Sequence, residues 1–119
     1  MPLRLEEATT STGEPYLRTH ATGMVTLADA ERLGALINPG GKFHKHKLLS
    51  IAVKDAEYSP EARKYLPGLR HQYKAIAIVF ESAVVRAAIN LMVRFTGDPG
   101  QLAMFRSEPE ALAWLESLD

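Results

Sequence analysis

The chain has 119 residues, 46% of them hydrophobic, and its 14 basic and 14 acidic side chains cancel to no formal net charge. This length and apolar content suit one compact domain, so we expect residues 1–119 to form a single domain. The balanced charge argues against nucleic acid as a partner, because nucleic acid selects a strongly basic surface. The absence of cysteine excludes disulfides, thiolate metal sites and cysteine nucleophiles.

The chain shows no segment in which basic residues precede an apolar stretch, as they do in a signal peptide. It also has no apolar run of about 18 residues, the length that a membrane-spanning helix needs. We therefore expect a cytoplasmic protein.

The first third of the sequence predicts two strands and a helix. Residues 3–10 and 16–22 flank a Gly-containing turn, which is typical of a β-hairpin. Thr26 can cap a helix whose apolar face begins at Leu27 and runs to Ile37. Asn38-Pro39-Gly40-Gly41 should end this helix, because proline cannot continue it and glycine readily adopts left-handed geometry.

The middle of the chain predicts a strand and a short helix. Residues 48–53 form an apolar run that is typical of a buried strand. Ser59 and Pro60 indicate a helix start, with serine as the cap and proline at the first helical position. This helix should be short, because Pro67-Gly68 soon ends or kinks it.

The last 46 residues carry the strongest fold signal. Residues 75–80 are apolar without alternation, as expected for a central strand covered on both faces. A helix over about 82–95, a strand at 102–105 and a helix after Ser107 follow. Strand, helix and strand in this order form a βαβ unit, so the fold class is α/β. The complete order predicted is β-β-α-β-α-β-α-β-α.

Three short segments carry a resemblance to a known family. They are Thr22–Thr26 before the first helix, Ile76–Val79, and the ending Phe105–Leu115 with its Ala-x-x-Trp-Leu helix. The chain resembles the STAS fold and, more narrowly, the SpoIIAA-like (STAS/SEC14-type) bacterial proteins. The resemblance implies a mixed sheet of about five strands with four helices. It also implies a mostly non-enzymatic role, either as a protein-interaction switch or as a binder of nonpolar ligands that associates with membranes.

Ser59 is the candidate residue for the switch. STAS proteins that antagonise anti-sigma factors carry a phosphoacceptor serine at the start of the helix after the third strand, within an Asp-Ser-x-Gly motif. Ser59 has the corresponding place, but the preceding Asp and the following Gly are absent, and Pro60 comes next. Capping alone explains a serine here, and phosphorylation of Ser59 is the alternative.

The remaining polar motifs give little chemistry. His44 and His46 are two imidazoles without a nearby third ligand, so we expect no metal and interpret residues 42–47 as a solvated basic loop. Contact of this loop, including Phe43, with an anionic surface is the alternative. Ser82 follows a strand but lacks the flanking glycines of a nucleophile elbow. We therefore expect no enzyme and no cofactor.

The helix over residues 83–95 is more apolar than a surface helix requires. Its polar residues Arg86, Asn90 and Arg94 form one narrow stripe. The wide apolar arc is consistent with complete burial, a homodimer face, a nonpolar ligand pocket or peripheral membrane contact.

Our hypothesis is a non-catalytic binding domain of the SpoIIAA-like type. It should accept a nonpolar small molecule, or a partner or membrane surface, near the second and third helices. The candidate ligand-binding residues are Tyr58, Tyr65, Val85, Ile89 and Met92. The alternative function is a phosphorylation-controlled anti-sigma factor antagonist.

Overall fold

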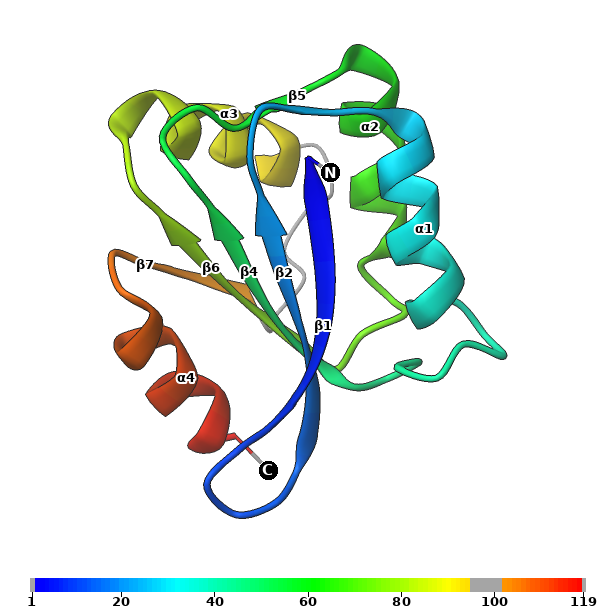
Figure 1. Ribbon diagram of the computed structural model, residues 1–119, viewed down its shortest axis with the longest axis vertical. Coiled ribbons are helices and arrows are strands. Elements are labelled where there is room, and N and C mark those ends of the chain that lie inside the picture. The colour runs from blue at the N-terminus through cyan, green and yellow to red at the C-terminus, as the bar shows by residue number, and fades with distance from the viewer. Residues whose placement is uncertain (1, 95–101, 119) are drawn as a thin grey trace.

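A five-stranded sheet with helices on both faces forms the domain (Figure 1). The computed structural model describes residues 2–94 and 102–118, and within this range it does not describe the side chains of residues 91–94. The elements in chain order are β1 (Leu3–Thr9), β2 (Pro15–Ala21), β3 (Met24–Val25), α1 (Leu27–Ile37), β4 (Lys47–Ala52), β5 (Glu57–Tyr58), α2 (Pro60–Tyr65), the 3-10 helix η1 (Leu66–Leu69), β6 (Ala75–Phe80), α3 (Ala83–Arg94), β7 (Leu102–Phe105) and α4 (Glu108–Glu116).

The main sheet has the strand order β1-β2-β4-β6-β7. β1 pairs with β2 in antiparallel orientation, which confirms the predicted hairpin. The pairs β2–β4, β4–β6 and β6–β7 are parallel, which confirms the βαβ unit at the C-terminal end. The predicted α/β class, with a mixed sheet of five strands and four helices, is thus correct.

The strand order explains which face each helix covers. From β2 onward the chain moves across the sheet in one direction, and right-handed crossovers in one direction place their helices on the same face. Helices α1, α2 and α3 therefore share one face. No strand follows β7 among the described residues, and α4 returns across the opposite face (Figure 1).

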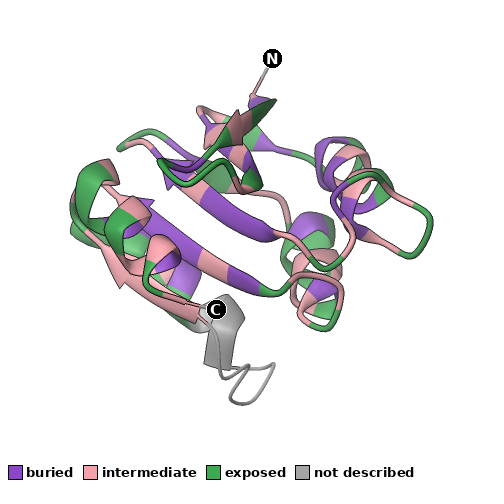
Figure 2. Cartoon of the chain, turned by 90° about the horizontal axis from the view of Figure 1, so that it is seen from below, coloured by how far each residue is buried: buried purple, intermediate pink, exposed green. Residues whose placement is uncertain are grey.

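The core is accordingly split into two layers by the sheet. On the three-helix face, Leu17, Leu48 and Ile78 of the strands pack with residues of α1, η1 and α3. On the α4 face, Leu49 and Ala77 pack with α4. The central strands are buried on both faces (Figure 2), as the apolar run at residues 75–80 predicted.

Hydroxyl side chains start each of the four described α-helices, and at α3 the Ser82 Oγ accepts the Val85 N–H at 3.2 Å. Thr26 forms a capping box with Asp29, whose carboxylate accepts the Thr26 backbone N–H at 2.9 Å. Ser59 Oγ accepts the Ala62 N–H at 3.1 Å, and Ser107 caps α4. Each cap satisfies backbone donors that the first helical turn leaves unpaired.

The structure adds one pairing that the sequence analysis did not predict. The two-residue strands β3 and β5 pair in parallel, with Val25 opposite Tyr58. Among the described residues, no helix is both long and apolar enough to cross a bilayer.

Candidate ligand cavity

A cavity of about 130 Å³ lies between the three-helix face of the sheet and the helices above it. Strands β2, β4, β6 and β7 contribute to its floor, while α1, η1 and α3 contribute to its walls. The lining residues are Leu3, Thr19, Ala21, Val25, Leu33, Ile37, Leu48, Ser50, Ile51, Ala52, Tyr58, Leu66, Pro67, Leu69, Arg70, Tyr73, Ile76, Ile78, Ile89 and Leu102.

Small side chains on neighbouring strands create the hollow. Ala21 of β2 lies opposite Ala52 of β4, and Thr19 lies opposite Ser50 in the same register. These four side chains point to the same face of the sheet, because residues two apart in a strand share a face. Because these four side chains are short, they leave a depression in the surface of the sheet. Larger side chains at the same positions would fill it.

The cover over this depression is also short. α2 has six residues and η1 has four, so this crossover reaches over only part of the sheet. Leu66 and Pro67 of η1 line the cavity, and so does Ile89 of α3. Space therefore remains between η1 and α3 above the sheet.

The few polar groups of the lining are hydrogen-bond donors or are already paired. Thr19 Oγ1 donates to Ser50 Oγ at 2.9 Å. Burial raises the pKa of Tyr58 to about 12, so its phenol stays protonated at neutral pH. Burial also raises the pKa of Tyr73, and the nearby positive charge of Arg70 partly opposes this rise.

The predicted ligand-binding residues lie at or near this cavity. Tyr58 and Ile89 line it directly. Val85 is buried in the same core, and Tyr65 packs at the edge of that core. The ring of Tyr65 lies against α1 at Gly34, where a Cβ atom would clash with the tyrosine hydroxyl. Met92 lies on α3, and its side chain falls outside the described residues.

Ser59, the predicted alternative phosphoacceptor, is half-buried at the start of α2. Its Oγ accepts the Ala62 N–H, so the capping interpretation is confirmed. Whether a kinase modifies Ser59 stays a prediction.

The interpretation of residues 42–47 as a solvated basic loop was wrong at two positions. Phe43 is buried in the core of the three-helix face, so its ring does not face an anionic surface. Lys47 is the first residue of β4 and is only 1% exposed. The histidines contact backbone carbonyls, with His44 Nδ1 2.9 Å from the Ile37 oxygen and His46 Nδ1 3.0 Å from the His44 oxygen.

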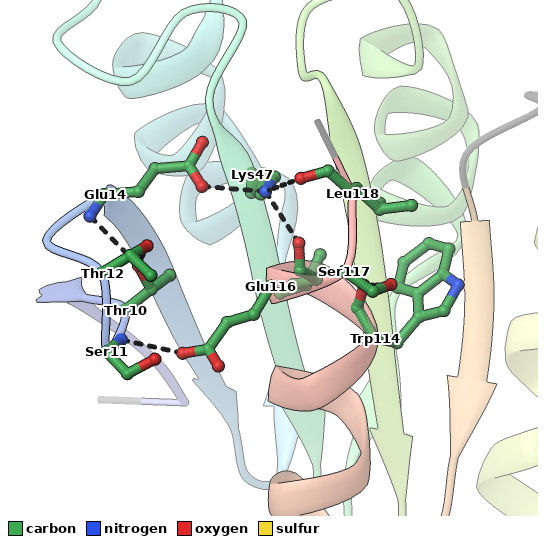
Figure 3. Close-up of polar contacts among 10 residues, drawn as sticks. Thr10, Ser11, Thr12, Glu14, Lys47, Trp114, Glu116, Ser117 and Leu118 are labelled. Atoms are coloured by element: carbon green, nitrogen blue, oxygen red, sulfur yellow. Dashed lines mark hydrogen bonds and ion pairs between the residues drawn. The ribbon is translucent and has the colours of Figure 1, made fainter.

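Lys47 instead joins the opposite face of the sheet to α4 (Figure 3). Its ammonium group donates to the carbonyls of Leu115 and Leu118 at 2.7 and 2.9 Å, and to Glu14 at 2.8 Å. An ammonium group has three protons, so all three are used. Lys47 is therefore a structural residue of β4 that holds the C-terminal end of α4.

Comparison with known proteins agrees with this architecture. The SpoIIAA-like family model matches residues 16–116. The chain belongs to the SpoIIAA-like family. No curated protein sequence is significantly similar to it. A crystal structure of an uncharacterised protein with a SpoIIAA-like fold from Shewanella loihica PV-4 superposes with a TM-score of 0.64 at 21% identity, covering 95% of this chain and 93% of that one. This likeness concerns the fold.

The SpoIIAA-like match includes every cavity-lining residue except Leu3. Sequence analysis missed much of this lining, including Arg70, Tyr73 and the alanines of β2 and β4. Thr19 and Ser50 did carry a signal, because a hydroxyl within a predicted buried strand needs a partner. Their pairing, however, depends on strand register, which the sequence did not reveal.

Proposed function

We propose that this protein is a non-catalytic binding domain that takes up a small apolar molecule in the cavity between η1, α3 and the sheet. The single observation that carries the proposal is the cavity itself, about 130 Å³ in volume and lined mainly by aliphatic side chains. Cavities of roughly this size with apolar walls bind benzene in another protein. The volume therefore suits one aromatic ring or a short alkyl chain.

The chemistry of the lining supports binding rather than catalysis. Burial keeps the Tyr58 phenol protonated, with a pKa of about 12, so it is poorly matched to proton transfer near neutral pH. The hydroxyls of Thr19 and Ser50 bond to each other. Aliphatic walls with a few polar groups are typical of sites that hold a ligand and fix its orientation.

Toluene is a suitable probe, because it matches the cavity in size and has no polar group. We expect saturable binding to the wild-type protein, detected by NMR shifts of backbone amides around the cavity. Ala52→Leu should weaken this binding more than tenfold, because its added side chain fills the floor next to Ala21.

Ala113→Leu is the matched control. It adds the same apolar volume on α4, where Ala113 is exposed on the far side of the sheet, and it should leave toluene binding unchanged. A wild-type protein without saturable toluene binding would contradict the proposed function.

A further inference from the structure

One charged side chain, Arg70, lines the cavity among the described residues, and no carboxylate does. Arg70 follows η1 directly and is held by its backbone N–H, which donates to the Pro67 carbonyl at 3.3 Å. Its side chain is half-buried, so it reaches both the cavity and the solvent. Arg70 therefore borders a mainly apolar space while part of the residue stays exposed to solvent.

The guanidinium of Arg70 still has donors to offer. Its Nε donates to His71 Nε2 at 3.1 Å, and the terminal nitrogens have no carboxylate within ion-pair distance among residues 2–94 and 102–118. Arginine presents five N–H donors in a planar fork that matches the two oxygens of a carboxylate. An acid group at the cavity opening would meet a partner of complementary charge and shape.

Tyr73 adds a second donor beside this arginine. It lines the same cavity, and the charge of Arg70 acts on its hydroxyl. Because burial raises the pKa of Tyr73, its phenol is protonated at neutral pH and can donate a hydrogen bond. The opening thus offers donors and a positive charge, whereas the interior offers aliphatic carbon.

We propose that the ligand of this cavity is a small amphipathic acid, whose carboxylate pairs with Arg70 and Tyr73 while its hydrocarbon part fills the interior. This inference rests on the proposed function and adds the chemical class of the ligand. A carboxylate inside the aliphatic interior would lose its hydration without compensation. The acid therefore stays at the opening, where charge-assisted hydrogen bonds to arginine are strongest.

The test compares hexanoate with 1-hexanol, which have the same chain length and differ in charge. Titration calorimetry on the wild-type protein at neutral pH should show hexanoate binding at least tenfold more tightly than hexanol. Arg70→Gln should remove this preference by weakening hexanoate at least tenfold, with hexanol unchanged. Tyr73→Phe should weaken hexanoate by a smaller factor.

Arg63→Gln is the matched control, because Arg63 is an exposed arginine on the neighbouring helix α2 and does not line the cavity. It makes the same change in net charge and should keep the hexanoate preference. Equal binding of hexanoate and hexanol by the wild-type protein would overturn the inference and leave the proposed function standing. Absence of binding by both would overturn both, and this comparison needs no variant to be folded.

Discussion

The two faces of the sheet differ in how completely their helices are fixed. On one face, α4 packs through Ala111 and Leu115, which are fully buried, and Lys47 ties its last turn to β4. Arg18 adds a bidentate contact to Glu108 in the first turn, at 2.8 and 3.0 Å. On the other face, α1, η1 and α3 surround a cavity of about 130 Å³.

The two faces therefore differ in how closely they are packed. Helix α4 is fixed at both ends and packs its buried side chains against the sheet, so it gives the sheet a rigid support. The fold can therefore tolerate a cavity under the short α2–η1 crossover on the three-helix face. The close packing on the α4 face supplies stability of its own. The same sheet therefore carries one closely packed helix on one face and borders a cavity on the other.

The largest expected effect contrasts two leucine truncations on opposite faces. Leu115→Ala should lower the free energy of unfolding by about 3–5 kcal/mol, because a fully buried side chain leaves a new void. Leu33→Ala should cost about 2 kcal/mol, at the lower end of such truncations, because Leu33 borders space that is already empty. Urea denaturation of both variants measures the difference. Equal costs would show that the two faces are packed alike.

Lys47 tests the anchor of α4. Lys47→Met keeps most of the side-chain volume but removes three hydrogen bonds from the ammonium group. We expect a loss of about 2–3 kcal/mol in unfolding free energy, because the carbonyls of Leu115 and Leu118 lose a charged donor. Thermal denaturation of the wild type and of Lys47→Met over a series of urea concentrations measures this loss of unfolding free energy.

Lys42→Met is the matched control for Lys47. Lys42 also pairs with a carboxylate, Glu7 at 2.6 Å, but both side chains are well exposed. Such surface pairs contribute about 0–1 kcal/mol, so the variant should remain close to wild type. A Lys47→Met variant as stable as Lys42→Met would contradict the structural role of Lys47.

How much the sequence predicted differs between local and long-range features. The apolar run at residues 75–80 and the caps at Thr26, Ser59 and Ser107 act over a few residues, so pattern alone located them. The role of Lys47 depends on carbonyls 68 and 71 residues away in sequence. From neighbouring residues alone, Lys47 was therefore assigned to the basic loop at residues 42–47.

The cavity was beyond sequence analysis for the same reason. The helix over residues 83–95 suggested an apolar surface in need of cover, and Ile89 of this helix does line the cavity. The empty space itself arises where Ala21 meets Ala52 and Thr19 meets Ser50 across two strands. These pairings depend on register, since a shift of one residue would turn the small side chains to the other face.

A third prediction makes the same substitution on each face. Ala77 of β6 is fully buried on the α4 face, whereas Ala52 of β4 borders the cavity. Ala77→Leu should destabilise by about 1–3 kcal/mol, because overfilling a packed core displaces its neighbours. Ala52→Leu should change stability by less than about 1 kcal/mol, since its new methyl groups enter empty space. Chemical denaturation compares the two, and a larger cost for Ala52→Leu would mean that the cavity cannot be filled.

The smallest expected effect concerns the ion pair at the start of α4. The hydrogen bonds from Arg18, followed by its positive charge, lower the pKa of Glu108, although burial partly opposes this shift. Glu108→Gln should cost at most about 1 kcal/mol at pH 7, because both partners are partly exposed to solvent. Glu110→Gln, in the same first turn of the helix, is the control for the loss of a negative charge near the helix dipole.

The pH dependence of this effect distinguishes an ion pair from simple packing. A carboxyl group whose pKa is lower in the folded protein stabilises the fold at pH values above its unfolded pKa, about 4.3 for glutamate. That contribution is lost as the pH falls through the lower, folded pKa. Wild type and Glu108→Gln should thus differ most at neutral pH and converge in acid. A difference that persists unchanged in acid would mean that the Arg18–Glu108 contact acts through packing, and that α4 is held mainly by Lys47 and its buried apolar residues.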